Sequence, residues 1–243
     1  MERTMKMMNA LVVMGALAAC DSGNVTGPSV LVPGPGGAPG PGPDVVNGAD
    51  IQGSGILATE SRGVAGFSRV RLDGVGHLIV EQGAAEALTV TADDNILPLV
   101  TAEVYGDELR LGTEPGATWA SPNPIVFTLT VAHCEALGVF GAAAAEIRGL
   151  DAHRFAVHIE GAGAVSAAGR ADEQEVVLRG VATYDGRNLQ SRVARVDVAG
   201  VSRATVRVQE RLEGRVEGQS TVEYIGRPVV DVTGGGAVQH IDG

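Results

Sequence analysis

The sequence predicts an all-β solenoid of stacked coils, on three observations. A five-residue phrase, apolar-x-apolar-x-Gly, recurs in the second half of the chain, and the glycines of successive copies are 16–20 residues apart. Glycine is abundant (35 residues) while aromatic residues make up only 3% of the chain, which suits a thin core of Val, Ile, Leu and Ala. No stretch after residue 20 has the apolar spacing of a helix.

The phrase is clearest at residues 196–200, which read Val-Asp-Val-Ala-Gly. Its two apolar residues point to one face of a strand, and coils stacked about 4.8 Å apart would bury that face. Glycine then lets the backbone turn a corner. We therefore expect Val196 and Val198 in the core, Asp197 on the surface and Gly200 at a corner. The glycines of the other copies are Gly141, Gly161, Gly180, Gly218 and Gly234.

Residues 1–19 have the parts of a secretory signal peptide, with Arg3 and Lys6 ahead of a mostly apolar run. The run ends in Leu-Ala-Ala-Cys, which resembles the lipobox of bacterial lipoproteins. The resemblance implies cleavage before Cys20 and acylation of that cysteine. The protein would then cross the inner membrane and stay lipid-anchored in the cell envelope, with the choice between inner and outer membrane left open. The alternative is an ordinary signal peptide with an incidental cysteine.

Residues 20–63 are expected to form a flexible tether, and residues 64–243 the folded domain. Between residues 33 and 43 the chain consists only of Pro, Gly and Ala, which disfavours both helix and strand. If Cys20 is acylated, Cys134 has no partner for a disulfide, so we expect it to be a small packed side chain.

The first part of the domain alternates apolar and polar residues in several short runs, with Gly106-Asp107 as a turn and a Pro/Gly-rich loop at residues 114–124. The expected strands are residues 70–74, 78–83, 88–92, 100–104, 108–111 and 125–131.

Several motifs follow one another in a characteristic order. They are Gly66-Phe67 with Val70, residues 80–83 (Val-Glu-Gln-Gly), 92–97 (Ala-Asp-Asp-Asn-Ile-Leu), 106–109 (Gly-Asp-Glu-Leu) and 224–228 (Tyr-Ile-Gly-Arg-Pro). With the glycine-marked repeats, they resemble the bacterial GIN-domain family, whose members are described as "putative autotransporter adhesin, head domain" and as a domain of unknown function. The resemblance runs from residue 64 to the C-terminus. It implies a right-handed parallel β-helix-like fold in secreted or lipid-anchored envelope proteins, and almost nothing about activity.

Asp93, Asp94 and Asn95 form the densest cluster of oxygen ligands, and they are a candidate cation or ligand contact. The alternative is a turn, because Asp and Asn bond their own backbone. No histidine has a zinc spacing with Cys134 or another histidine, and His158 occupies an outward position of the repeat, so we predict no metal site.

No nucleophile elbow, phosphate-binding loop or dinucleotide fingerprint occurs, so we predict no catalytic residue and no cofactor. Polysaccharide lyases with β-helices group Asp with Lys or Arg, whereas Arg179, Arg203 and Arg215 are scattered here and the only lysine is Lys6.

The sequence thus favours a lipid-anchored envelope β-solenoid with a non-enzymatic adhesion, surface-interaction or structural role. The alternative is a carbohydrate-binding or carbohydrate-cleaving β-helix protein. The expected partners are the membrane, through the anchor, and a surface glycan or envelope protein. The net charge of −11 disfavours nucleic acid. An uncapped end of the solenoid would leave an open strand edge at which two copies could pair.

Overall fold

The computed structural model describes residues 51–242, which belong to one compact unit. They are mostly strand, with a single 3-10 turn (η1, Leu97–Leu99) and no α-helix, so the all-β prediction is confirmed. In this part of the chain, no helix has the length and apolar character needed to span a bilayer. The predicted signal peptide, Cys20 and the Pro/Gly-rich stretch lie outside the described residues.

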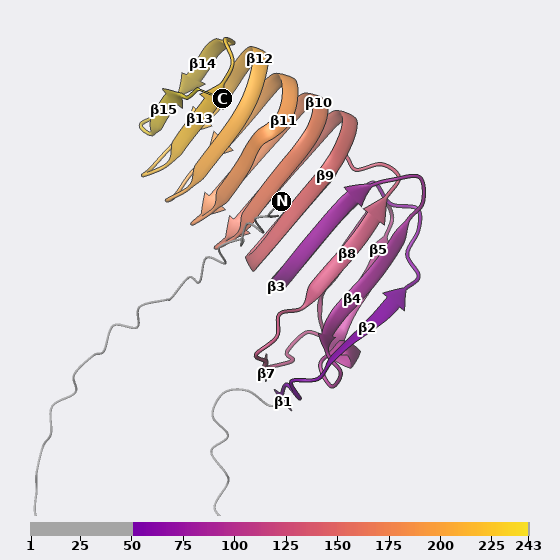
Figure 1. Cartoon of the computed structure of the whole chain (residues 1–243). Helices are drawn as coiled ribbons and strands as arrows, with labels where there is room; N and C mark the ends of the chain where they lie inside the picture. Colours follow the sequence, from indigo (N-terminus) through magenta and orange to yellow (C-terminus); the bar gives the residue numbers. More distant parts are fainter. Residues whose placement is uncertain (1–50, 243) are drawn as a thin grey trace, which may run out of the picture. The chain divides into compact units, whose positions relative to one another are not determined.

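Five long strands lie side by side, each parallel to the next (Figure 1). They are β3 (Arg69–Gln82), β9 (Ala136–Gly161), β10 (Ala164–Gly180), β11 (Thr183–Val198) and β12 (Arg203–Val216). Three short strands continue the parallel order beyond β12, namely β13 (Thr221–Ile225), β14 (Val229–Thr233) and β15 (Ala237–His240). The valines and other β-branched residues that alternate along these strands favour the extended conformation.

The first part of the described chain pairs differently. β4 (Ala87–Asp93) lies antiparallel between β2 (Leu57–Arg62) and β8 (Val126–Val131). A hairpin joins β5 (Val100–Tyr105) to β6 (Glu108–Thr113), and both β6 and β8 pair parallel with β3. A separate small pair consists of β1 (Ile51–Gln52) and β7 (Trp119–Ala120).

The large sheet is therefore mixed, which differs from the parallel β-helix-like solenoid expected for residues 64–243. Gly106, with φ +64°, lies in a two-residue turn that reverses the chain between β5 and β6, and such a turn makes their pairing antiparallel. The boundary expected at residue 63 also needs correction. Residues 57–62 pair with β4 along their whole length, because their backbone completes the antiparallel edge of the sheet.

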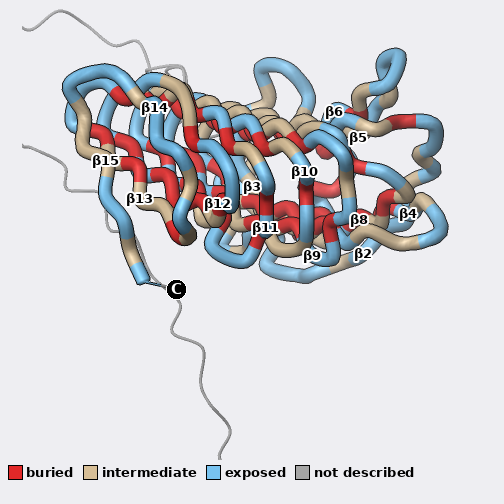
Figure 2. Tube along the Cα trace, turned by 90° about the horizontal axis from the view of Figure 1, so that it is seen from above, coloured by how far each residue is buried: buried red, intermediate tan, exposed pale blue. Residues whose placement is uncertain are grey.

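Neighbouring repeats lie in register, so equivalent apolar residues stack. Ile159, Leu178 and Val198 are successive partners across β9, β10 and β11, and all three are fully buried. Val196 is buried as well, whereas half of the Asp197 side chain is exposed. Figure 2 shows buried positions recurring on successive strands, where each valine contributes about 1.5–3 kcal/mol. The predicted inward and outward assignment of residues 196–198 is confirmed.

A polar chain crosses the core between the strands. The Tyr184 hydroxyl donates to Gln174 Oε1 (3.2 Å), and Gln174 Nε2 donates to Ser191 Oγ (2.6 Å). The Ser191 hydroxyl donates in turn to the Arg207 carbonyl (2.9 Å). Tyr184 is completely buried, and burial raises the pKa of its hydroxyl. Tyr184, Gln174 and Ser191 thus each have a hydrogen-bond partner, as a low-dielectric interior requires.

Two further expectations concern Cys134 and the end of the sheet. Cys134 is buried as a free thiol, which confirms the packed side chain, and burial raises its pKa to about 12. At the other end, β14 and β15 each pair on one side only among the described residues, and Val229 and Val230 are exposed. Pairing of two copies at this edge stays a prediction.

Candidate functional site

The three residues predicted as a ligand contact lie where β4 ends in a turn. The Asp93 carboxylate is fully buried and accepts hydrogen bonds from Asn123 Nδ2 (2.7 Å) and Ser121 Oγ (2.7 Å). These two donors, Asn123 foremost, stabilise the charged form and hold the pKa of Asp93 below its ordinary value. Asp93 therefore fastens the loop before β8 to the end of β4.

Asp94 and Asn95 fasten the segment before β2 in the same way. The Ser54 hydroxyl donates to Asp94 Oδ1, and the Ser54 N–H donates to Asn95 Oδ1 (2.9 Å). The Asn95 amide donates to the Gln52 carbonyl (2.8 Å). Donors of the same chain thus occupy oxygens that a cation would need, which favours the turn over the ligand contact. Within residues 51–242, no three His, Cys, Asp or Glu side chains are grouped as a metal site would require.

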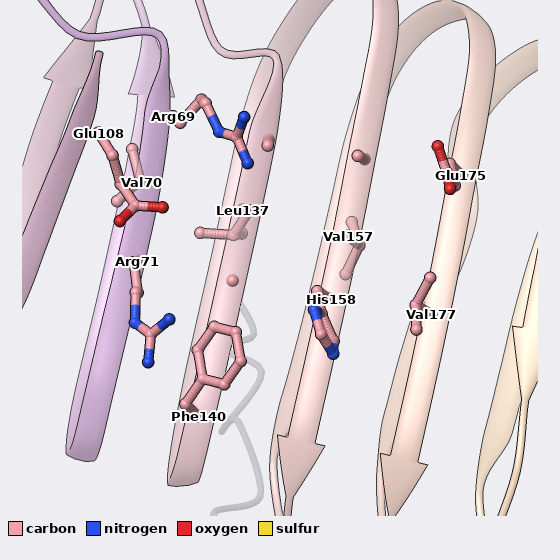
Figure 3. A pocket seen from close by; sticks show the side chains of 13 residues that line it. Arg69, Val70, Arg71, Glu108, Leu137, Phe140, Val157, His158, Glu175 and Val177 are labelled. Carbon is pink, nitrogen blue, oxygen red and sulfur yellow. The ribbon is translucent and has the colours of Figure 1, made fainter. Parts of the chain in front are cut away.

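A hollow of about 460 Å³ lies elsewhere, on the outer face of β3, β9 and β10. Arg69 and Arg71 of β3 form one wall, and Glu175 and Val177 of β10 form the opposite wall (Figure 3). We call this site the outer hollow. β9 passes through it twice, at residues 136–140 and 156–158, because its two parts lie side by side, joined by the hydrogen bond from Ala156 N to Glu135 O (2.8 Å).

Small residues form the floor of the outer hollow. Arg69 pairs with Ala136 and Arg71 with Gly138, while Ala156 pairs with Glu175. Between Arg69 and Glu175, both segments of β9 thus carry alanine, whereas Gly138 and His158 lie between Arg71 and Val177. Three strand spacings of about 4.8 Å separate β3 from β10, so the walls stand roughly 14 Å apart. The volume falls in the range typical of small-molecule sites, on the order of 300–1,000 Å³.

Phe140 closes one end of the outer hollow. The Arg71 guanidinium lies 3.8 Å from the centroid of its ring, and the His158 ring meets it edge-on with centroids 5.0 Å apart. Asp73 binds Arg71 through both carboxylate oxygens (2.9 Å each), which raises the pKa of Arg71. Arg71 is thus fixed by a carboxylate and a ring, and His158, which was expected at an outward position, is half-buried against Phe140.

Beside the outer hollow, charged side chains neutralise one another. The Glu173 carboxylate lies 3.2 Å from Arg154 Nη2 and 3.0 Å from Arg195 Nη1, while Arg195 Nε lies 2.7 Å from Glu213 Oε1. This chain of ion pairs runs across four adjacent strand segments. The two arginines lower the pKa of Glu173, Arg195 more strongly than Arg154.

Two charged side chains of the outer hollow are exceptions to this pattern. Arg69 is exposed, and no residue of the described chain hydrogen-bonds or ion-pairs with its guanidinium. The Glu175 carboxylate is exposed and equally without a partner among residues 51–242. Glu108, on the β3 side, keeps one oxygen free, since Arg110 Nε binds only Oε1 (2.7 Å). The hollow therefore presents an unpaired cation and an unpaired anion on opposite walls.

Sequence reasoning did not find this site. The signal in the sequence is Gly138 and two alanines in outward positions of consecutive repeats, and outward positions could be aligned across strands only once the register was known. Arg69 and Glu175 are more than 100 residues apart in sequence, and the fold brings them to one face.

A family model described as "Putative auto-transporter adhesin, head GIN domain" matches residues 66–228. This confirms the resemblance drawn from the motifs, and the family description gives an adhesion-type role. No curated protein matches the chain.

Solved structures share the fold. A "putative adhesin" from Bacteroides fragilis has a TM-score of 0.64 at 20% identity, covering 79% of this chain and 100% of its own. A "putative adhesin" from Parabacteroides distasonis has a TM-score of 0.50 at 20% identity, with 79% and 99% covered. A "putative lipid binding protein" from the same species has a TM-score of 0.51 at 16% identity, again with 79% and 99% covered.

Proposed function

Because this chain belongs to the GIN-domain family of "putative auto-transporter adhesin" head domains, we propose that it is a lipid-anchored protein of the bacterial cell envelope with a non-enzymatic adhesive role. Residues 1–19 direct export, Cys20 carries the lipid, and the residues after it hold the folded domain away from the membrane. The outer face of the parallel strands meets the binding partner.

The fold proposed for the parallel part is a right-handed β-helix. Each of β9, β10 and β11 pairs with the strand that follows it in sequence, and partner residues on neighbouring strands are 17–20 positions apart, as in Val157, Val176 and Val196. A parallel connection of this kind is right-handed in nearly all proteins. The result is a rigid scaffold whose outward side chains are displayed in straight rows.

The outer hollow carries the proposal. Arg69 and Glu175 are exposed there and have no partner in the described chain. The neighbouring charged side chains, from Arg154 to Glu213, form ion pairs with one another. Exposed charges with no internal partner on a rigid sheet are what a binding surface requires, since the fold does not use them.

The test compares cells that display the full chain with cells that carry the Cys20→Ser variant. We expect the wild-type cells to retain the protein in the membrane fraction and to adhere several-fold better to glycan- or matrix-coated surfaces. Equal adhesion with and without the displayed chain would contradict an adhesive role. Release of reducing sugar from a glycan substrate by the purified chain would contradict the non-enzymatic part and favour a carbohydrate-cleaving protein.

The lipid anchor has its own readout. Metabolic labelling with a fatty acid should label the wild-type protein and leave the Cys20→Ser variant unlabelled. Label on the variant would place the lipid elsewhere.

A further inference from the structure

We infer that the outer hollow binds an anionic saccharide, whose carboxylate or phosphate pairs with Arg69 and whose hydroxyls donate to Glu175 and Glu108. The inference rests on the proposed binding role of this face and names the chemical class of its ligand. Four features of the site lead to it.

The first feature is the state of the two arginines. Arg71 is held by Asp73 and by the Phe140 ring, so its guanidinium adds positive charge to the wall without being free to turn. Arg69 stands two residues earlier on the same strand face, exposed and without a partner in the described chain. A free guanidinium presents a planar pair of N–H donors that fits the two oxygens of a carboxylate or phosphate. The anionic group of the ligand is therefore placed on the β3 side.

The second feature is the acceptor set on both walls. Glu175 on β10 has both carboxylate oxygens available, and Glu108 beside β3 has one. Ionised carboxylates only accept hydrogen bonds. The anionic group of the ligand pairs with Arg69, so other groups of the ligand must donate to the carboxylates. The ligand must then offer several neutral donors, and a ring of hydroxyl groups supplies them. An inorganic anion alone would leave Glu175 with nothing to bind.

The third feature is the size and floor of the site. The walls stand roughly 14 Å apart, a span that fits one to two sugar rings lying over the small residues Ala136 and Ala156, beside the Phe140 ring that covers Gly138. Phe140 and Val177 at the margins give apolar contact to the C–H faces of a ring. About 460 Å³ suffices for a disaccharide.

The fourth feature excludes a peptide added as an extra strand. β3, β9 and β10 are each paired with a neighbour on both sides across this face, so their backbone N–H and C=O groups are already used. Strand addition needs a free edge, and the outer hollow lies in the middle of the sheet. Recognition there must come from side chains.

The experiment measures binding to the purified full-length chain by isothermal titration and by NMR shift mapping. The probes are digalacturonate, galactose 6-phosphate, neutral galactobiose and a short acidic peptide. We expect at least one of the two anionic sugars to bind, the carboxylate and phosphate arms showing which anion is preferred, and galactobiose to bind at least tenfold more weakly. Shifts should centre on Gly138 and Ala156.

Variants test the assignment of the two walls. Arg69→Gln and Glu175→Gln should each weaken binding of the anionic sugar at least tenfold, and Ala156→Phe should block it by filling the floor. Arg227→Gln is the matched control, because Arg227 is the other arginine in the described chain with no partner and does not line the hollow. It should bind as the wild type does.

The outcomes separate this inference from the proposed function. If no anionic sugar binds while displayed cells still adhere, or if Arg69→Gln leaves sugar binding unchanged, the saccharide assignment is wrong and the adhesive role stands. Tighter binding of the acidic peptide, with the same dependence on Arg69, would likewise overturn the saccharide in favour of a protein partner. If cells that display the wild-type chain adhere no better than cells without it, the proposed function itself is wrong.

Discussion

Gly200 lies directly against Gly180 of the preceding repeat. A Cβ atom built on Gly200 would stand 2.3 Å from the Gly180 carbonyl oxygen, and the N–H of Val201 donates to that same oxygen (2.8 Å). Gly180 has the same relation to Gly161, and Gly161 to Gly141, with Cβ-to-oxygen distances of 2.6 Å in both cases. The recurring glycine therefore does more than permit a corner. Because it has no Cβ atom, the backbones of successive repeats can lie in direct contact at this position.

This contact predicts a loss of stability for Gly200→Ala. The position has φ +96°, which costs a non-glycine residue on the order of 1–3 kcal/mol, and the overlap with Gly180 adds to that cost. We expect a lower midpoint in urea denaturation of the purified chain. Gly235→Ala is the control, since Gly235 has no positive φ and no atom within 4 Å of its would-be Cβ. A Gly200→Ala variant as stable as the control would show that the close contact between Gly200 and Gly180 does not require glycine.

The buried column of valines gives a second prediction. Val198→Asp places an unpaired charge between Leu178 and Val216, its partners on either side, and we expect a loss of more than about 4 kcal/mol or failure to fold. Asp197→Lys, one residue away, breaks only a half-exposed pair with Arg179 and should cost about 1 kcal/mol or less. Thermal unfolding followed by circular dichroism compares the two. The reverse ranking would mean that the assigned strand faces are wrong.

The periodicity of the sequence predicts the parallel strands because their burial pattern depends on residues that are close together in the chain. In residues 196–200 the alternation alone separates core from surface, and the spacing of the glycines predicts which residues stack. The antiparallel edge formed by β2 and β4 was missed because residues 57–62 carry an exposed, polar strand whose pairing partner is about 30 residues away.

The outer hollow could not be predicted from the sequence for a related reason. It depends on the small side chains of Ala136 and Ala156, and small residues at outward positions do not indicate a site until the residues on either side of them are known. The candidate contact at Asp93 differs, because its acidic residues do indicate a ligand site in the sequence. Only the structure shows that Ser121 and Asn123 donate hydrogen bonds to the Asp93 oxygens.

The polar chain in the core gives a third prediction. Tyr184→Phe removes the donor to Gln174 Oε1 and leaves a buried acceptor unpaired, so we expect a loss of about 1–3 kcal/mol with no change in binding at the outer face. Denaturation in urea measures the loss. The double variant Tyr184→Phe with Gln174→Leu should lose less than the sum of the single variants, because it removes both partners of the bond. Strict additivity would show that the two side chains act independently.

Asp93 gives a prediction about pH. Its pKa is lowered in the folded protein by Asn123 first and Ser121 second, so the unfolded chain binds a proton more readily than the folded one. The contribution of Asp93 is therefore fully present above the ordinary pKa of a carboxyl group, about 3.9. It is lost as the pH falls through the lower, folded-state value.

Because the Asp93 carboxylate also accepts from the Gly55 N–H (3.1 Å), loss of its charge should loosen the segment before β2 ahead of the parallel strands. Hydrogen exchange at Gly55, measured from pH 7 downward, should stay slow relative to the intrinsic rate until the medium is more acidic than the ordinary carboxyl range. Asp93→Asn should lose this protection at every pH, since an amide cannot accept from all three donors. Asp231→Asn, at an exposed position of β14, should behave as the wild type does. Protection of Gly55 in Asp93→Asn equal to that of the wild type would show that the charge of Asp93 does not hold this segment in place.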